Sequence, residues 1–255
     1  SAWPEARTDR RLEGRVGVLM VAGGQGSRLG FPGPKGAFPI GPVSSRSLLE
    51  LLAQKLRGVA RRYGCRVPVY LMTSPDTDAA TRRLFETNGH FGLDPEGLFF
   101  FSQRRVPALD FEGLLMLEGP DRIAESPDGH GASIPGLLAS GALTQMQERG
   151  ISTVFYCHVD NPLVRIADPL LVGFRAINGA EVACKIVRKR DPREGLGTLA
   201  RVDGRAAVVE YMEIEEPHRS LRDSAGELVF WAGSIGVHAL GVEFLRRVAG
   251  DSESL

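Results

Sequence analysis

The stretch VGVLMVAGGQGSRLGFPGPKG, residues 16–36, predicts the central feature of the fold. Its first seven residues form an uncharged run that ends in glycines and shows no alternation of apolar and polar positions. This pattern is typical of a strand buried on both faces of a sheet. Gly23, Gly24 and Gly26 follow at once. Because glycine lacks a side chain, backbone N–H groups in such a loop can approach a phosphate or a nucleobase edge closely.

Two basic residues, Arg28 and Lys35, lie on the same loop, and both side-chain types bind phosphate oxygens. The two commonest phosphate-binding motifs do not match. The dinucleotide fingerprint fails because the next glycine after Gly26 is Gly30, and the Walker A motif fails because Lys35 is followed by glycine instead of Ser or Thr. Kinase, ATPase and dehydrogenase interpretations therefore lose their main support. For the loop alone, a glycine-rich β–α turn with a surface arginine and lysine remains the alternative.

Apolar patterns predict an alternation of strands and helices along most of the chain. Ser47 is a plausible N-cap for the helix that follows the loop. The predicted strands are residues 16–22, 67–73, 98–102 and 153–159, and the predicted helices are residues 47–63, 76–88, 134–148 and 168–178. Such alternation implies a mostly parallel sheet with helices on both faces, which is an α/β fold.

The pattern changes after residue 180, where short strand candidates are separated by turns. They are residues 181–188, 198–202, 206–211, 228–231 and 234–238, with turns at Asp203-Gly204 and Ala225-Gly226. We expect these strands to form a second layer over one end of the sheet. Residues 7–15, at the other end of the chain, are a charged lead-in that could end a helix.

Composition narrows the class of protein. The 255 residues are 43% hydrophobic and 24% charged, which suits a globular domain with a sizeable core. Lys plus Arg (31) equals Asp plus Glu (31), so no overall field would attract nucleic acid or an anionic membrane. The cysteines, Cys65, Cys157 and Cys184, form neither a disulfide framework nor a zinc pattern. With no signal peptide and no run of 18 apolar residues, a soluble cytoplasmic protein is expected.

The loop resembles the signature of the UDP-sugar pyrophosphorylases, particularly the UDP-N-acetylglucosamine pyrophosphorylase branch. That branch carries Leu-Ala-Gly-Gly-Gln-Gly-Thr-Arg-Leu-Gly and then Pro-Lys-Gly, from which Val21 and Ser27 depart mildly. Further matching segments follow in order: LMTS at 71–74, NGHFGL at 88–93, FFFSQRRVP at 99–107, SPDGHG at 126–131, YCHVDN at 156–161, VVEYME at 208–213 and WAGSIGVH at 231–238. Several motifs in one order are far more specific than one loop.

The resemblance implies a fold and an activity. The fold would be a Rossmann-like, mixed, mostly parallel sheet of the nucleotide-diphospho-sugar transferase (GT-A-like) type with extra short strands. Residues 1–15 would be a lead-in, residues 16–250 the catalytic domain, and a further C-terminal region would follow Leu255. The activity would be uridylyl transfer, which forms UDP-sugar and pyrophosphate from UTP and a sugar-1-phosphate, with N-acetylhexosamine-1-phosphate as the favoured substrate. No nucleic-acid or membrane partner is expected.

This reaction needs no protein nucleophile, because positioning and charge neutralisation carry it. By the resemblance, Arg28 and Lys35 bind the triphosphate. Asp160 follows the predicted strand 153–159, and the resemblance makes it a ligand of Mg²⁺, the expected cofactor, near the α-phosphate. Without the family, an aspartate in this place would be assigned to a helix cap or a turn.

The resemblance also implies which residues contact the nucleotide and which contact the sugar. It places Ala22, Gly23 and Gly24 at the nucleotide and Gly129 against the base. Gln103 would read the uracil edge, because its carboxamide offers both a donor and an acceptor. The sugar contacts would be His130, Glu210, Tyr211 and Ser234. For Glu210, an ordinary exposed edge-strand glutamate is the alternative.

Three departures from the family pattern leave other functions open. His130 and Ser234 each stand where the hexosamine enzymes have asparagine, so UDP-glucose or UDP-galactose pyrophosphorylase is an alternative. The family also uses C-terminal lysines for phosphate binding, and residues 195–255 contain no lysine. A catalytically silent UDP-sugar-binding protein is therefore a further alternative, although the presence of Arg28, Lys35 and Asp160 argues against it.

Overall fold

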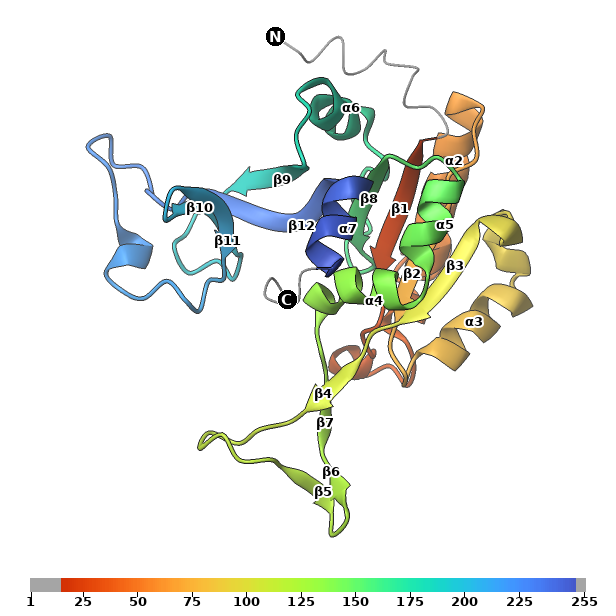
Figure 1. Ribbon diagram of the computed structural model, residues 1–255, viewed down its shortest axis with the longest axis horizontal. Helices are drawn as coiled ribbons and strands as arrows, with labels where there is room; N and C mark the ends of the chain where they lie inside the picture. The colour runs from red at the N-terminus through yellow and green to blue at the C-terminus, as the bar shows by residue number, and fades with distance from the viewer. Residues whose placement is uncertain (1–14, 251–255) are drawn as a thin grey trace.

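A computed structural model describes residues 15–250 and shows a central sheet between two layers of helices (Figure 1). Within the described residues the sheet has eight strands in the order β11-β10-β12-β8-β1-β2-β3, and β9 pairs with β12. The expected α/β fold with a mixed sheet, parallel in its centre, is confirmed. The expectation for residues 7–14 lies outside the described residues.

The parallel centre consists of the four strands predicted from apolar runs: β1 (Val16–Val21), β2 (Val69–Thr73), β3 (Leu98–Ser102) and β8 (Thr153–His158). β1 lies between β2 and β8, and Val21 is in register with both Met72 and His158. The carboxyl ends of β1, β2 and β8 therefore lie at one edge of the sheet, and β3 joins them beside β2.

The later strands extend this sheet on one side. They are β9 (Val182–Arg188), β10 (Thr198–Val202), β11 (Arg205–Val209) and β12 (Ala232–Gly241). The expected second layer is wrong, because β12 pairs antiparallel with β8, β9 and β10. β12 satisfies the backbone hydrogen-bonding groups on the edge of β8 that β1 leaves open, so the short strands join the main sheet.

Residues 228–231 do not form the expected strand. Only Leu228 makes a β-type contact, an isolated bridge to Arg222 across the turn that contains Gly226. The turn predicted at Asp203-Gly204 is confirmed as the connection between β10 and β11. Both residues have positive φ angles, 48° and 79°, as a tight two-residue hairpin turn requires.

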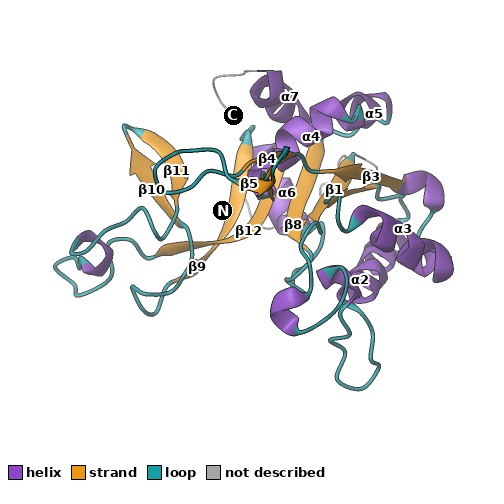
Figure 2. Cartoon of the chain, turned by 90° about the horizontal axis from the view of Figure 1, so that it is seen from below, coloured by secondary structure: helices purple, strands orange, loops and turns teal. Residues whose placement is uncertain are grey.

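Helices cover both faces of the sheet (Figure 2). On one face lie α2 (Leu48–Tyr63), α3 (Asp78–Thr87) and α6 (Pro169–Ile177), and on the other lie α4 (Ser133–Ala139), α5 (Ala142–Glu148) and α7 (Val242–Gly250). The predicted cap of α2 is confirmed, since the Ser47 side chain accepts a hydrogen bond from the Glu50 N–H at 3.2 Å.

The single helix predicted for residues 134–148 is wrong, because α4 ends at Ala139 and α5 begins at Ala142. Gly141 between them has a φ angle of 78°, which a continuing α-helix cannot accommodate. The sequence GLLASGALTQM keeps an apolar face on both sides of this glycine, so the periodicity alone did not reveal the break.

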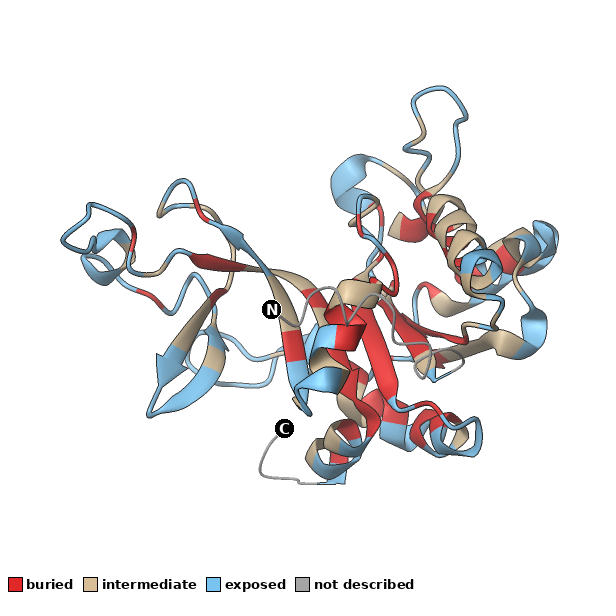
Figure 3. Ribbon diagram, turned by 90° about the horizontal axis from the view of Figure 1, so that it is seen from above, coloured by how far each residue is buried: buried red, intermediate tan, exposed pale blue. Residues whose placement is uncertain are grey.

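Two hydrophobic clusters fill the space on either side of the sheet, and alternate residues of β1 belong to them in turn. The buried residues gather along the central strands and the helices against them (Figure 3). On β1, Val18 and Met20 belong to the cluster under α2 and α6, whereas Leu19 belongs to the cluster under α5 and α7. Because the sheet is buried on both sides, β1 has no polar side chain on either face, which explains the unbroken run at residues 16–22.

Sequence patterns did not predict the segment between β3 and α4. Two narrow ribbons project from the body here (Figure 1): β4 (Arg105–Pro107) with β7 (Glu125–Pro127), and β5 (Leu117–Gly119) with β6 (Arg122–Ile123). Short 3₁₀ turns complete the fold at Ser27–Leu29, Lys35–Ala37, Gly89–Gly92, Pro95–Gly97, His130–Ala132 and His218–Ser220. Among residues 15–250, the helices are too short or too polar to cross a membrane.

Candidate functional site

The candidate site follows the edge where the four parallel strands end. Gly23 follows β1, Thr73 ends β2, Gln103 follows β3 and Asp160 follows β8. Ligands of open α/β sheets bind outside the carboxyl ends of the strands. The parallel pairing of β1 with β2 and β8 therefore brings together residues that are far apart in the chain.

The glycine-rich loop folds back on itself after β1. The Gly26 N–H donates to the Gly33 carbonyl at 2.8 Å, and the Lys35 N–H donates to the Gly24 carbonyl at 2.9 Å. Gly36 then packs directly on α2, because a Cβ built there would lie only 2.6 Å from Leu49 Cδ1. These contacts place Lys35 beside Gly24.

Lys35 and Asp160 form an ion pair at the centre of the edge. Lys35 Nζ lies 3.0 Å from Asp160 Oδ2, and the two side chains are 28% and 50% exposed. A pair this accessible contributes about 0–1 kcal/mol to stability. Both groups remain open to a ligand that carries charge of either sign.

Arg28 is not joined to this pair. It lies in the exposed 3₁₀ turn Ser27–Leu29, and its guanidinium makes no hydrogen bond or ion pair with any residue in the described part of the chain. Its predicted role at a triphosphate stays a prediction. An unpaired, exposed guanidinium on the loop is nevertheless available to an anion.

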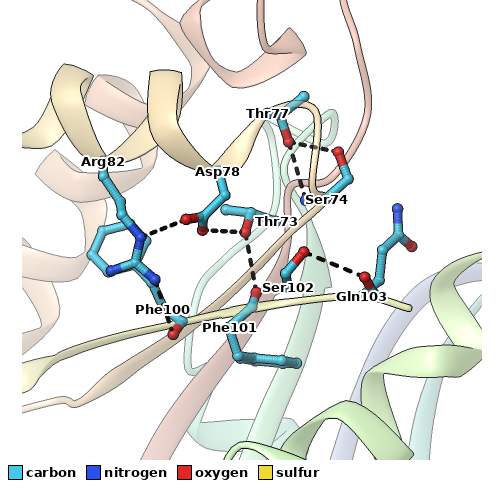
Figure 4. Close-up of polar contacts among 9 residues, drawn as sticks. All are labelled: Thr73, Ser74, Thr77, Asp78, Arg82, Phe100, Phe101, Ser102 and Gln103. Carbon is cyan, nitrogen blue, oxygen red and sulfur yellow. Dashed lines mark hydrogen bonds and ion pairs between the residues drawn. The ribbon is translucent and has the colours of Figure 1, made fainter. Parts of the chain in front are cut away.

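Gln103 occupies the other end of the edge. Its residue is 7% exposed, and its backbone N–H donates to the Thr73 carbonyl at 3.0 Å. The side chain lies against Gly23, where a Cβ would be 2.9 Å from Gln103 Nε2. The carboxamide makes no hydrogen bond to the described residues and points away from Ser102 (Figure 4). Its donor and acceptor are both free. Ala22, predicted to contact the nucleotide, is buried beside Gly23.

A polar network that the sequence patterns did not predict lies at the end of β2, beside Gln103 (Figure 4). The Thr73 hydroxyl donates to Asp78 Oδ1 at 2.6 Å, and Arg82 Nε donates to the other oxygen of that carboxylate at 2.6 Å. Thr77 Oγ1 accepts from the Ser74 N–H at 3.1 Å and lies 3.5 Å from the Gly23 carbonyl oxygen. The polar run TSPDTD directly after a buried strand was the available signal.

Gly129, predicted to press on the base, lies at the foot of the β4–β7 ribbon with a φ angle of 81°. Arg104, next to Gln103, pairs with Asp128 at 3.1 Å, which ties the Gly129 turn to the end of β3. The Asp128 N–H also donates to the Arg104 carbonyl at 3.2 Å, so the residues that join Gly129 and Gln103 in the structure are their chain neighbours Asp128 and Arg104.

A cluster of aromatic and imidazole rings continues the edge beyond Asp160, and sequence analysis identified only His130 of its members. Tyr156 Oη lies 3.2 Å from His158 Nε2 and 3.4 Å from His130 Nδ1. The His238 ring, opposite Tyr156 on β12, has its centroid 5.5 Å from the tyrosine ring. The spacing of Tyr156 and His158 on β8 was the available signal, because residues two apart share one face of a strand.

Burial disfavours the charged form of two imidazoles of this cluster, His158 and His238. Burial, together with the neighbouring His158 and His130, lowers the pKa of His238 to about 4. Burial also lowers the pKa of His158, and the nearby His130 adds to this effect. His238 Nδ1 is buried without a hydrogen-bond partner in the described residues, so a proton there would have no acceptor.

The predicted sugar contacts reach the cluster through β12. Gly236, with a φ angle of 63°, lies against His158, because a Cβ there would be 2.8 Å from His158 Cδ2. Two residues earlier, the Ser234 N–H donates to the Gly197 carbonyl at 2.7 Å. A Cβ on Gly197 would in turn lie 3.3 Å from Glu210 Oε1.

Glu210 and Tyr211 are exposed, and the Tyr211 ring lies beside Gly195. A line of contacts and chain neighbours therefore runs from Gln103 and Gly23, through Lys35 beside Gly24, to Asp160. It continues through His158, two residues before Asp160 in the chain, to β12 and Glu210. Among the hydrogen bonds of residues 15–250, none links Arg28 or Gly129 directly to this line.

Asp160 is the group on this line best suited to a hard cation. No set of three or more His, Cys, Asp or Glu residues in the described part of the chain could hold a metal. Mg²⁺ is commonly bound by one or two carboxylates, with water and substrate phosphates as its other ligands. The half-exposed Asp160 carboxylate is suited to this kind of coordination.

Replacing Gly23 with alanine should destabilise the fold. The added Cβ would lie 2.9 Å from Gln103 Nε2 and 3.1 Å from the Thr73 carbonyl oxygen. Overpacking of this kind costs about 1–3 kcal/mol. Gly24→Ala is the matched control, because the nearest atom would be Lys35 Cε at 3.6 Å. Urea unfolding should show a lower midpoint for Gly23→Ala and an unchanged midpoint for Gly24→Ala. Equal midpoints for both variants would contradict this packing.

Stability should also fall in mild acid because of His238. Its folded pKa of about 4 lies below the ordinary value of 6.5, so the unfolded chain binds the proton first. This contribution is complete above pH 6.5 and is lost as the pH falls towards 4. The melting temperature of His238→Phe should therefore fall less between pH 7 and pH 5 than that of the parent. The exposed His218, changed to Phe, is the control, and equal losses in parent and His238→Phe would contradict the assignment.

Comparisons with known proteins agree with this arrangement. The family model described as UTP–glucose-1-phosphate uridylyltransferase matches residues 3–252. The chain is 40% identical over 265 residues to UDP-N-acetylhexosamine pyrophosphorylase-like protein 1 of Homo sapiens, covering 99% of this chain and 52% of the relative. It is 38% identical over 239 residues to the UDP-N-acetylglucosamine pyrophosphorylase of Saccharomyces cerevisiae, covering 92% of this chain and 50% of that enzyme.

Among solved structures, the uridine diphosphate N-acetylglucosamine pyrophosphorylase of Trypanosoma brucei superposes with a TM-score of 0.87 at 32% identity, covering 100% of this chain and 51% of that one. The chain thus spans about half the length of the relatives it matches. The family match extends over nearly every residue, and the resemblance inferred from the motifs is confirmed. This chain belongs to the UTP–glucose-1-phosphate uridylyltransferase family.

Proposed function

We propose that this chain carries the nucleotide and sugar site of a uridylyltransferase that joins UTP to a sugar-1-phosphate and releases pyrophosphate. The observation that carries the proposal is the Lys35–Asp160 pair, with a nitrogen-to-oxygen distance of 3.0 Å, at the carboxyl edge of the parallel strands. A cation-binding carboxylate and a phosphate-binding ammonium side by side suit a metal–triphosphate complex.

The groups on either side of the pair define two ends of the site. The free carboxamide of Gln103 is suited to the edge of uracil, which presents both an acceptor and a donor. On the other side, His130, Ser234 and Glu210 offer polar groups for a sugar. The order along the edge is then base, phosphates and sugar, which is the order of the parts of a UDP-sugar.

The chemistry at the pair is a displacement at phosphorus. An oxygen of the sugar-1-phosphate forms a bond to the α-phosphorus of UTP. The bond from that phosphorus to the oxygen bridging to the β-phosphate breaks, and pyrophosphate leaves with the bonding electrons. Lys35 and the exposed Arg28 neutralise charge on the phosphates as it moves towards the leaving group. No side chain acts as a nucleophile.

Magnesium is part of the proposal, with Asp160 as its protein ligand. When bound, the ion supplies charge neutralisation at the phosphates. Asp160 is half exposed, so its carboxylate can turn from Lys35 to a cation without loss of packing. Lys35 would then face the phosphate oxygens.

The identity of the sugar is proposed from the relatives. Those named above as pyrophosphorylases of UDP-N-acetylhexosamine or UDP-N-acetylglucosamine are 38–40% identical to this chain, which supports N-acetylhexosamine-1-phosphate. His130 and Ser234 favour a second candidate, glucose- or galactose-1-phosphate, because each stands where the hexosamine enzymes have asparagine. We propose a cytoplasmic location, supported by three cysteines that are all free thiols.

A pyrophosphate-release assay on the intact protein tests the proposal. With Mg²⁺ and UTP, N-acetylglucosamine-1-phosphate should give the fastest release, followed by glucose- and galactose-1-phosphate. ATP in place of UTP should be a poor substrate, because a wrong base leaves the Gln103 carboxamide unpaired. UDP-sugar binding without pyrophosphate release would support a silent binding protein, and equal rates with ATP and UTP would contradict the role of Gln103.

Lys35→Ala should damage turnover far more than stability. Losing one preorganised charge at a reacting phosphate costs roughly 10²- to 10³-fold in turnover, whereas losing an exposed pair costs about 0–1 kcal/mol of stability. Turnover and melting temperature are measured on the same preparations. Unchanged turnover would show that this loop does not bind the reacting phosphates.

Lys185→Ala is the matched control for that experiment. Lys185 pairs with Asp168, which is 4% exposed and caps α6 away from the carboxyl edge. Removing this lysine leaves a buried carboxylate with poorer partners, which costs roughly 1–3 kcal/mol. The control should therefore lose stability and keep the turnover of its folded fraction, which is the opposite pattern to Lys35→Ala.

A further inference from the structure

Tyr156 differs from the other buried tyrosine of the sheet, Tyr70. The two residues are 5% and 0% exposed, and both lie on strands of the parallel centre. The Tyr70 hydroxyl has no hydrogen-bond partner in the described residues. The Tyr156 hydroxyl lies between two imidazoles, His130 Nδ1 at 3.4 Å and His158 Nε2 at 3.2 Å. A hydroxyl with two ring-nitrogen partners orients those rings.

His130 has one nitrogen in this network and one outside it. Nδ1 faces Tyr156, whereas Nε2 makes no hydrogen bond to the described residues, and the residue as a whole is exposed. The ring stands on the 3₁₀ turn His130–Ala132, directly after Gly129. Its inner edge is therefore held by the protein and its outer edge is open to a ligand.

His158 is held from the opposite side by the backbone of β12. The register of β12 against β9 shifts between Ser234 and His238, and Gly236 within that irregularity has a φ angle of 63°. A Cβ on Gly236 would lie 2.8 Å from His158 Cδ2 and 3.0 Å from Nε2. Gly236 thus allows the strand to close on the ring and keeps His158 against Tyr156.

The hydrogen bonds of the Tyr156 hydroxyl couple the His130 and His158 rings, because their direction decides which ring nitrogen carries a proton. The Tyr156 hydroxyl has one proton, so it donates to one imidazole and accepts from the other. If it donates to His130 Nδ1, then His130 carries its own proton on Nε2, at the open edge. An outward N–H suits a ligand that presents acceptors, such as the phosphate and acyl oxygens of an N-acetylated sugar phosphate.

We propose that Tyr156 is a positioning residue for the sugar half of the site, which fixes the ring of His130 through a His158–Tyr156–His130 hydrogen-bonded relay. This inference rests on the proposed function and adds to it a residue that the family resemblance does not assign. Tyr156 touches no ligand in this scheme. It acts through His130, so removing its hydroxyl weakens binding of the sugar part of the ligand. Binding of the nucleotide part, at Gln103, stays unchanged.

Calorimetry with UDP and with UDP-N-acetylglucosamine tests the proposal on the intact protein. Tyr156→Phe keeps the buried ring and removes only the hydroxyl. It should weaken UDP-N-acetylglucosamine binding about fivefold, the typical effect of one hydrogen bond, and leave UDP binding unchanged. Tyr70→Phe, which removes a hydroxyl without a partner, should change neither affinity. His158→Phe, which keeps a ring but lacks Nε2, should reproduce the effect of Tyr156→Phe.

A double variant separates positioning from packing. In a His130→Ala background, Tyr156→Phe should have no further effect on UDP-N-acetylglucosamine binding, because the ring that it positions is gone. Equal affinity of parent and Tyr156→Phe for UDP-N-acetylglucosamine, or additive losses in the double variant, would overturn the relay and leave the proposed function intact. A parent that binds neither UDP nor UDP-N-acetylglucosamine would overturn the proposed function and the relay together.

Discussion

The parallel pairing of β1 with β2 on one side and β8 on the other is the constraint on which the site depends. A strand that is buried on both faces and paired on both edges has almost no freedom to shift, because a slip of one residue would exchange its two apolar faces. Val21 is consequently fixed opposite both Met72 and His158. Everything that follows these three residues emerges at the same edge, so the loop after β1, the network after β2 and Asp160 after β8 meet there.

The helices and β12 reinforce that constraint from different sides. Leu49 of α2 packs on Gly36 and so holds the far end of the glycine-rich loop, while β12 closes the open edge of β8 and carries Gly236 to His158. The polar side of the site is thus supported by apolar contacts a few residues away. The loops at the edge need few contacts of their own, and the chemical groups can remain accessible.

Sequence patterns predicted the central strands and α2 because their apolar patterns, glycines and caps are local signals. The break at Gly141 was missed because apolar periodicity continues across it. The place of β12 could not be predicted, since nothing local says which strand an extended segment will pair with. The candidate site was predictable in part, because some of its residues lie close together in one motif. Gly24 and Lys35 belong to one motif, and their proximity is confirmed, whereas the contact of Tyr156 with His130 depends on how α4 is attached to the sheet.

The Lys35–Asp160 pair has a consequence for how a charged substrate arrives. In the free protein the two charges cancel, and the chain as a whole has a formal net charge of zero at pH 7. The pair therefore projects little field into solution, and long-range attraction would contribute little to the rate of encounter with a charged substrate. In the proposed function, a metal–triphosphate complex would bring its own cation and anion, so each member of the pair would exchange one oppositely charged partner for another. Binding would then proceed by exchange of partners at short range, and neither charge would be left alone.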